Sequence, residues 1–257
     1  MKRICLWMAI LSMAMMLAGC SGGDSSLKKI KDRKVLKVGV KVDVPGIGFL
    51  NAQTNELEGL EIDLAKLIAE DMFGSGDALK PVSVTALTRE TMLDNEEIDL
   101  VIATFTITDE RKQKFHFTAP YFQDAIGLMT FKDAGYKGLE DMNGKTIGTV
   151  QFGTAYKALA AEAESLGVDV NIMQYASYPE VMVALLSGQV DAFSADKPML
   201  WGYVDAQTEV LDASFGPQDY GIASKLDHTS LAKYLDDFLA KIEKDGRLAE
   251  IRARWAR

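Results

Sequence analysis

Short strand-like runs alternate with helical patterns in the first half of this chain, and that alternation most constrains its fold. The apolar run 100–103 is continuous and short, which suits a strand that is covered on both faces. The large apolar residues of 60–72 fall on one helical face, and Gly74 ends the pattern. The predicted elements are strands at 35–40, 82–87 and 100–103 and helices at 60–72 and from Arg89. This β-α-β-α-β order predicts a parallel sheet with right-handed crossovers.

The same pattern starts again in the second half of the chain. The predicted elements are strands at 146–150, 170–174 and 190–195 and helices at 155–166 and from Ser177 to Gly188. A strand at 218–223 and a helix at 231–242 follow. No stretch repeats residue for residue, yet two α/β units in series predict two lobes, each with a doubly wound sheet, rather than one long sheet. The predicted fold class is therefore α/β.

The N-terminal segment 1–19 differs from the rest of the chain. Two basic residues precede an apolar run over 4–17, which is too short to span a membrane as a mature helix and predicts a secretory signal. The run ends in LAGC, which resembles the bacterial lipobox, so we expect Cys20 to be lipidated and to become the mature N-terminus. A signal peptide that happens to carry a cysteine is the alternative. Residues 20–34 are polar and then basic, which predicts a flexible tether.

Charge and residue usage argue against several classes of protein. Removal of the predicted signal leaves 26 basic and 37 acidic side chains, a formal charge of −11, which makes nucleic acid an unsuitable partner. Cys5 would leave with the signal, so we expect no disulfide, thiol catalysis or cysteine metal site. His116 and His228 stand far apart in no ligand spacing, so we expect no zinc site. We also expect no cofactor, and a monomer.

Polar side chains follow the predicted strand 100–103 at the point where it ends. Thr104, Thr106 and Thr108 come just beyond its carboxyl end, where open α/β sheets bind ligands. Arg111 follows within a few residues and can offer a planar fork of donors to a carboxylate, with hydroxyls and backbone amides completing the oxygen shell. The segment therefore predicts a carboxylate receptor. An ordinary capped turn with a surface arginine is the alternative.

The string TFTITDERKQKFHFTAPYF resembles the segment that grips the ligand's α-carboxylate in extracellular solute-binding proteins of polar amino-acid ABC transporters, family 3. The resemblance extends from about Leu36 to Trp255. Through VKVDVP, TFTITDER, DAFSADK and PQDYGI it is closest to the branch that binds aspartate and glutamate. It implies a two-lobed type II periplasmic-binding-protein fold whose chain tail returns to the first lobe. The implied division is lobe one at 35–122 and 221–257, lobe two at 126–217, and two hinge crossovers at 122–126 and 217–221.

The resemblance also assigns roles to residues around the ligand's amino-acid core. It implies that Thr104, Thr106 and Arg111 hold the α-carboxylate and that Asp196 pairs with the α-ammonium. Thr154 opens a helix whose free amides and dipole favour an anionic oxygen, so lobe two would help to hold the carboxylate when the cleft shuts. Two alternatives remain open, since Asp196 could cap the helix that follows it and Thr154 could serve as an N-cap.

Lys41 and Arg89 are the residues that discriminate between ligands. In the resembled branch the matching lysine and arginine meet the side-chain carboxylate, and the tyrosine matching Tyr220 contributes a hydroxyl. The alternative is that Lys41 pairs with Asp43, and Arg89 with Glu90, on the surface.

Charge counting supports an acidic ligand independently. Lys41 and Arg89, with Arg111 and Asp196, sum to +2 in the cleft. Closure on a zwitterion with a neutral side chain would bury two unmatched cations, at several kcal/mol each, and a dicarboxylic amino acid lowers that cost. The loop 42–48 contains no aromatic residue to stack on a cationic side chain, which makes lysine or arginine a poor ligand.

The sequence therefore predicts an exported, lipid-anchored receptor in the periplasm or on the outer cell surface. It would bind aspartate or glutamate between its lobes and deliver the ligand to an ABC permease. A receptor for glutamine, asparagine or cystine, or a chemosensory or adhesin role, is the alternative. A dehydratase on the same scaffold would need a free general acid or base, and because Asp196 is committed to binding we expect no enzyme.

Overall fold

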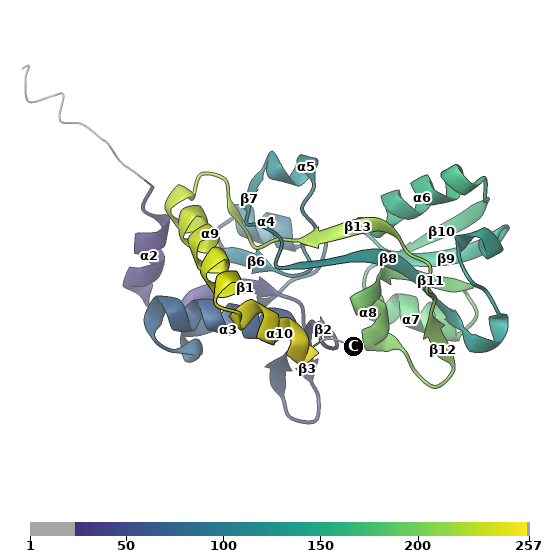
Figure 1. The fold of residues 1–257 in the computed structure, drawn as a ribbon, viewed down its shortest axis with the longest axis horizontal. Coiled ribbons are helices and arrows are strands. Elements are labelled where there is room, and N and C mark those ends of the chain that lie inside the picture. Colours follow the sequence, from purple (N-terminus) through teal and green to yellow (C-terminus); the bar gives the residue numbers. More distant parts are fainter. Residues whose placement is uncertain (1–23, 256–257) are drawn as a thin grey trace, which may run out of the picture.

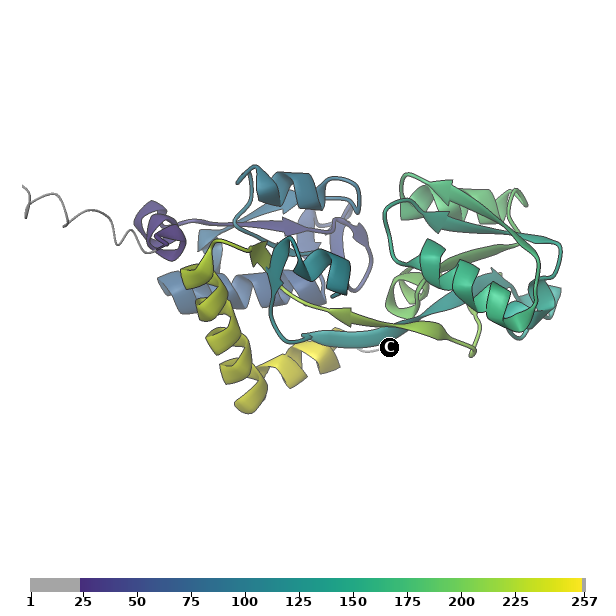
Figure 2. The same ribbon diagram turned by 90° about the horizontal axis from the view of Figure 1, so that it is seen from above.

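The computed structural model describes residues 24–255, which form two lobes joined by a pair of long strands (Figure 1). Figure 2 shows the lobes side by side, with the joining strands along one edge. The signal-peptide and lipidation predictions, Cys20 included, lie outside the described residues. Within 24–255, no helix is long and apolar enough to cross a membrane.

Lobe one is built on a five-stranded sheet in the order β5-β1-β6-β14-β7, in which β5, β1 and β6 are parallel. Its strands are β1 (Leu36–Val40), β5 (Leu79–Ser83), β6 (Leu100–Ile102), β7 (Phe115–Phe117) and β14 (Ala223–Lys225). Its helices are α2 (Ser26–Arg33), α3 (Leu60–Phe73), η2 (Gly76–Ala78), α4 (Arg89–Asp94), α5 (Asp109–Lys112), α9 (Thr229–Lys244) and α10 (Arg247–Trp255). The predicted β-α-β-α-β order is confirmed, and Gly74 ends α3 in the left-handed conformation.

Three predictions in lobe one are corrected. The strand predicted at 82–87 lies at 79–83 instead, and Pro81 is tolerated within it because β5 is an edge strand. The loop predicted after Lys41 contains a small antiparallel sheet, β2 (Asp43–Val44), β3 (Gly48–Asn51) and β4 (Glu56–Glu58). The part of the predicted tether that is described is mostly helical, since α2 packs on α9 and the Asp24 carboxylate accepts from the Ser230 amide at 2.6 Å.

Lobe two repeats the arrangement with a six-stranded sheet in the order β10-β9-β11-β8-β12, in which β13 also pairs with β8. Its other strands are β9 (Lys145–Val150), β10 (Val170–Tyr175), β11 (Ala192–Asp196) and β12 (Thr208–Val210). Its helices are η3 (Lys132–Ala134), η4 (Leu139–Met142), α6 (Ala155–Leu166), α7 (Tyr178–Leu186) and α8 (Lys197–Tyr203). Ser177 caps α7 by accepting from the Glu180 amide, as the sequence pattern indicated.

The two joining strands are β8 (Phe122–Phe131) and β13 (Phe215–Tyr220), which pair with each other in antiparallel register. The single strand predicted at 218–223 is in fact divided at Gly221 between β13 and β14, which belong to different sheets. A Cβ at Gly221 would lie 2.9 Å from Ile107, so the chain passes closely over lobe one where it changes sheets.

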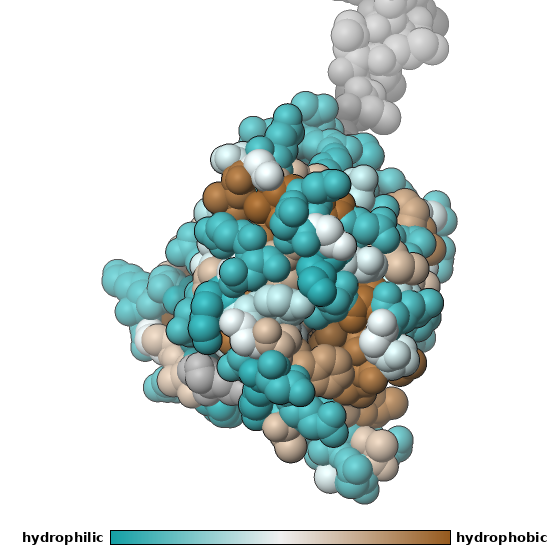
Figure 3. Space-filling model, turned by 90° about the vertical axis from the view of Figure 1, so that its right-hand side faces the viewer, coloured by the Kyte–Doolittle hydropathy of each residue, from teal (hydrophilic) through white to brown (hydrophobic). Residues whose placement is uncertain are grey.

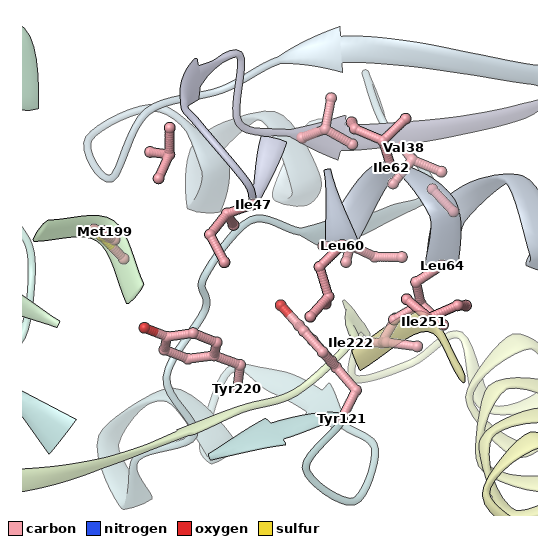
Figure 4. Packing of buried hydrophobic residues seen from close by; sticks show 14 of the residues in the cluster. Val38, Ile47, Leu60, Ile62, Leu64, Tyr121, Met199, Tyr220, Ile222 and Ile251 are labelled. Carbon is pink, nitrogen blue, oxygen red and sulfur yellow. The ribbon is translucent and has the colours of Figure 1, made fainter. Parts of the chain in front are cut away.

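Apolar side chains of both lobes meet in one buried cluster. Ile47 and Leu60 of lobe one belong to it together with Met199 of lobe two (Figure 4). On the outside, the end of the molecule that lobe two forms carries hydrophobic residues between hydrophilic ones (Figure 3). Val183 and Leu186 of α7 are among the exposed apolar side chains of that lobe. Buried apolar side chains therefore form part of the contact between the lobes.

Candidate functional site

A small cavity lies between the two lobes and is lined by residues of both. Its volume is about 20 Å³, roughly the space that one or two waters need. The predicted site residues that line it are Arg89, Thr104, Thr106, Thr154 and Asp196. Tyr178 of α7 also lines it, although the sequence pattern did not indicate this residue. A wider cleft of about 620 Å³ adjoins the cavity at Thr154 and is bordered by Arg111.

A hydrogen-bonded group centred on Gln218 joins the lobes beside this cavity. The hydroxyls of Thr106 in lobe one and Thr154 in lobe two both donate to Gln218 Oε1, each at an oxygen–oxygen distance of 2.7 Å. Thr154 is the N-cap residue of α6, but its side chain makes no capping hydrogen bond. The sequence analysis missed Gln218, although its position in a predicted crossover was a usable signal, because a buried polar side chain on a joining strand must find partners.

Arg111 lies on α5, where the Thr108 side chain accepts from the Arg111 amide at 3.2 Å. The alternative of a capped turn therefore describes the backbone correctly, but the arginine is not on the surface, since it is only 9% exposed. Its Nη1 donates to the Thr106 carbonyl at 2.8 Å and its Nη2 to the lobe-two carbonyl of Phe152 at 3.5 Å. Burial lowers the pKa of Arg111 to about 10, so the guanidinium stays charged at neutral pH.

Asp196 and Tyr220 form a buried pair at the other end of the site. The Tyr220 hydroxyl donates to Asp196 Oδ2, and burial raises the pKa of Asp196 to about 6. Asp196 is the N-cap residue of α8 but makes no side-chain capping bond, so the alternative capping role is not filled. Tyr220 does not line the cavity and lies between Tyr121 and Met199 (Figure 4). In this structure the Tyr220 hydroxyl is engaged by Asp196, and its predicted contact with a ligand side chain stays a prediction.

Thr104 is held in an unusual conformation by a residue that the sequence analysis missed. Its φ of +46° lies in the left-handed region, which is strained for a β-branched residue. The Thr104 amide donates to Glu61 Oε1 at 2.6 Å, and the Tyr121 hydroxyl donates to the same oxygen at 2.6 Å. Glu61 is fully buried at the first turn of α3, and burial raises its pKa to about 6. Acidic residues are common in first turns, so nothing in the sequence pattern indicated that this one is buried.

Lys41 is placed differently from its prediction. Its Nζ lies 2.9 Å from the Asp43 carboxylate and 5.0 Å from the centre of the Tyr178 ring, and it does not line the cavity. The alternative pairing with Asp43 is therefore correct, except that Lys41 is buried rather than on the surface. The cause is local: the short strand β2 starts two residues after Lys41 and holds Asp43 beside it.

Arg89 lines the cavity as predicted. It is 3% exposed, and its Nη1 donates to the carbonyls of Ala103 at 2.8 Å and Thr104 at 3.2 Å. The alternative pairing with Glu90 is wrong, since Glu90 instead lies 3.6 Å from Arg111. The Nε of Arg89 has no hydrogen-bond partner among the described residues. Burial lowers the pKa of Arg89.

The charge count that favoured an acidic ligand changes once neighbouring carboxylates are placed. Asp43 lies 2.9 Å from Lys41, and Glu90 lies 3.6 Å from Arg111. Glu61 interacts electrostatically with Lys41 and Arg89. The three carboxylates turn a surplus of two positive charges into a deficit of one. The electrostatic reason for an acidic ligand is therefore lost, because the count made from the sequence included none of these three carboxylates.

A second interlobe contact lies away from the cavity, at residues 43–48, which we call the lip. Backbone meets backbone there, since a Cβ added at Gly202 of α8 would lie 2.7 Å from the Pro45 carbonyl oxygen. The Tyr203 hydroxyl donates to the carbonyl of Asp43. Beside the lip is a largely apolar cavity of about 170 Å³ lined in part by Trp201 and Trp255.

Between residues 24 and 255, no cluster of three or more His, Cys, Asp or Glu side chains could hold a metal ion.

Comparison with known families gives a match over nearly the whole described chain. Residues 36–257 match the family described as bacterial extracellular solute-binding proteins, family 3. The glutamine-binding protein of Geobacillus stearothermophilus is 34% identical over 91% of this chain and 99% of its own length. The ABC transporter glutamine-binding protein GlnH of Bacillus subtilis is 33% identical over 99% of this chain and 97% of its own length.

Solved structures give the same result for the fold. An ancestral arginine-binding protein bound to arginine superposes with a TM-score of 0.78 at 30% identity, covering 88% of this chain and 99% of the other. The two-lobed arrangement described above is thus shared along almost the full length of that protein.

Proposed function

Because the chain belongs to the bacterial extracellular solute-binding proteins of family 3, we propose that it is a receptor that binds an amino acid between its lobes and delivers it to an ABC permease. The α-carboxylate would be held by Thr104, Thr106 and Arg111 with help from Thr154, and the α-ammonium by Asp196. We propose a binding role without a chemical step, since the carboxyl of Asp196 is engaged by Tyr220 and would be engaged by the ligand.

One observation carries this proposal: donors and a carboxylate from both lobes line one small cavity. Hydroxyls and a guanidinium suit a carboxylate, whereas a buried carboxyl suits an ammonium. The two poles of an α-amino acid are thereby both matched, with the guanidinium and most hydroxyls from lobe one and the carboxylate from lobe two. Charge-assisted hydrogen bonds of this kind are the stronger ones, so the closed form is favoured when ligand is present.

We propose that the lobes move apart to admit the ligand, since the cavity between them has room for only about one or two waters. We propose that β8 and β13 bend at 122–126 and 217–221, between a lobe one of 35–122 and 221–257 and a lobe two of 126–217. Within residues 24–255, β8 and β13 run from one lobe to the other, and bending of these two strands would let the lobes close as rigid bodies.

For the ligand side chain we propose a neutral carboxamide, with glutamine first. The unpartnered Nε of Arg89 is a donor for an amide oxygen, and the local charge is no longer positive once Asp43, Glu61 and Glu90 are counted. Relatives that are named glutamine-binding proteins support the same choice. Cystine and asparagine are the other neutral candidates.

An acidic amino acid is the second candidate, and Arg89 is the observation that favours it. A buried guanidinium with a free N–H can donate to a side-chain carboxylate as readily as to an amide oxygen, and the carboxylate would also compensate its positive charge. The preference for aspartate or glutamate that the sequence analysis predicted therefore stays a prediction.

Calorimetry of the purified protein against the twenty common amino acids tests both candidates. We expect glutamine to bind more tightly than glutamate, its matched acidic analogue. The reverse order would establish the acidic candidate, and absence of binding by every amino acid would overturn the proposal. Loss of uptake in a deletion strain would separate transport from a chemosensory or adhesin role.

We also propose export and lipid anchoring at Cys20, followed by residence in the periplasm or on the outer cell surface. The support is the LAGC string after an apolar run, together with a family whose description places its members outside the cell. Each buried methylene of an acyl chain adds about 0.8 kcal/mol of membrane affinity, so a lipidated Cys20 would hold the receptor near its permease. Mass spectrometry of the mature protein should find an acylated N-terminal Cys20.

A further inference from the structure

The Gln218 side chain accepts hydrogen bonds from the same two threonine hydroxyls that the proposed ligand needs. Its side chain is on β13, one of the two strands that join the lobes, and the residue is 4% exposed. Its Oε1 accepts from the Thr106 and Thr154 hydroxyls, one from each lobe, both at 2.7 Å. A carbonyl oxygen has two lone pairs, and here both are used.

The orientation of the Gln218 amide follows from its third contact. Its Nε2 lies 2.9 Å from the Gly216 carbonyl oxygen, which can only accept. The NH₂ group must therefore face Gly216, and the oxygen must face the two threonines. Since an amide oxygen cannot donate, each threonine hydroxyl uses its single O–H to donate to Gln218.

From this inventory we propose that Gln218 is a built-in competitor for the carboxylate-binding hydroxyls. A threonine hydroxyl has one proton to donate, so Thr106 and Thr154 cannot donate to Gln218 and to a ligand carboxylate at the same time. The amide oxygen accepts from the same two hydroxyls that the proposed ligand carboxylate would use. This inference deepens the proposed function and rests on it for the identity of the ligand.

The two hydrogen bonds to Gln218 also link the lobes. Thr106 and Thr154 come from different lobes, so a single oxygen that accepts from both links the lobes without ligand. Opening would separate the two hydroxyls and break at least one of the bonds. Gln218 therefore shifts the ligand-free protein toward closure, and a ligand must displace a state that is already satisfied, which lowers its apparent affinity.

The test replaces Gln218 by methionine, which keeps the length of the side chain and removes the acceptor. The matched control is Gln189→Met, because the Gln189 amide oxygen also accepts from a hydroxyl, that of Tyr175 at 3.3 Å, but within lobe two. Gln218→Ala serves as a second variant that adds no new bulk. Two quantities are measured: the radius of gyration of the ligand-free proteins by small-angle scattering, and the dissociation constant for glutamine by calorimetry.

We expect the ligand-free Gln218→Met protein to be more expanded than wild type and to bind glutamine roughly tenfold more tightly, since about two hydrogen bonds of competition are removed. The Gln189→Met protein should match wild type in both. If the folded Gln218 variants are as compact as wild type without ligand, the proposed competition by Gln218 is wrong. It is also wrong if they bind glutamine no more tightly than wild type does. If wild type binds no amino acid, the proposed function fails, while scattering of the ligand-free variants still decides whether Gln218 links the lobes.

Discussion

The two sides of the interlobe boundary are built in different ways. On the cavity side, hydrogen-bonding groups from both lobes meet, through Gln218 at one end and through Asp196 and Tyr220 at the other. On the lip side, the backbone at Pro45 stands against Gly202 with no room for a methyl group. The cavity side consists of polar contacts that a carboxylate and an ammonium can take over, whereas the lip consists mainly of a steric contact that no ligand alters.

This difference separates two properties of a closing receptor. Hydrogen bonds on the cavity side are exchangeable, so they determine how favourable closure is with and without ligand. The lip determines how near the lobes can come, because close-packed backbone cannot be compressed. Substitutions on the cavity side should therefore change affinity strongly, and substitutions at the lip should change it less while leaving the polar contacts intact.

The largest effect is expected from Arg111→Met on the cavity side. The change removes the guanidinium that reaches the Phe152 carbonyl of lobe two and would leave the ligand carboxylate buried without its cation. We expect a loss of roughly 3 to 5 kcal/mol in binding, more than a hundredfold in affinity by calorimetry. Lys114→Met, an exposed cation at the edge of the adjoining cleft, is the control and should bind normally. Near-normal affinity of a folded Arg111→Met protein would place the carboxylate elsewhere.

Acidification should weaken binding through Asp196. Burial raises the pKa of this carboxyl to about 6, so below that pH the ligand-free protein holds it protonated and the ammonium loses its partner. We expect affinity to fall by roughly tenfold for each pH unit below 6. The same shift makes the carboxyl's contribution to folding stability largest below pH 4 and diminishing as the pH rises toward 6, because the folded state binds the extra proton.

Asp196→Asn should bind weakly at every pH and lose this dependence. Glu61 has a pKa raised to about 6 as well, so Glu61→Gln is the control that separates the two carboxyls. A pH dependence that survives in Asp196→Asn and disappears in Glu61→Gln would transfer the effect to the contact between Glu61 and Thr104.

A smaller loss is expected when the lip is obstructed by Gly202→Ala. The new methyl group would stand 2.7 Å from the Pro45 carbonyl oxygen, which belongs to the backbone and cannot turn aside. Closure should stop short, and affinity should fall roughly three- to tenfold with the melting temperature of the ligand-free protein preserved. Gly76→Ala, where the nearest atom is 3.6 Å away, is the control. Wild-type affinity in Gly202→Ala would mean that the lobes do not close this far with ligand.

The smallest effect is expected from Tyr203→Phe, which removes the hydroxyl that donates to the Asp43 carbonyl. One hydrogen bond is worth about 1 kcal/mol net, so affinity should fall by no more than severalfold. Tyr156→Phe on α6, at 39% exposure, controls for loss of a tyrosine hydroxyl. A loss as large as that of Arg111→Met would make the lip a determinant of affinity and remove the distinction between the two sides.

Much of the fold followed from local patterns. The helix predicted at 155–166 has these bounds in the structure, and Gly167 follows it in the left-handed conformation. Apolar periodicity and glycine stops are local, so a sequence displays them directly. The errors arose where tertiary contacts decide: α2 is helical against α9, and the segment predicted as one strand at 218–223 is shared between two sheets.

The site followed from the sequence only in part. Strand ends and the resemblance located Arg89, Thr104, Thr106, Thr154 and Asp196, all of which line the cavity. Strand ends and the resemblance did not identify Gln218, whose place in a predicted crossover was a weak signal. Glu61 could not be found, because a glutamate in a first turn is ordinary until the partners that bury it are known.

The sequence by itself determined which residues stand at strand ends and hence which polar groups face the cleft. Only the tertiary structure decided which of the possible pairs form and whether they are buried, because a sequence offers several partners for each charge, some near along the chain as for Lys41 and some distant as for Arg111. Lys41 next to Asp43 and Arg111 near Glu90 change the net charge of the site, and no pattern along the chain states which carboxylate will lie within 4 Å of which cation. Electrostatic energy depends on distances in space, whereas the sequence fixes only the inventory of charges.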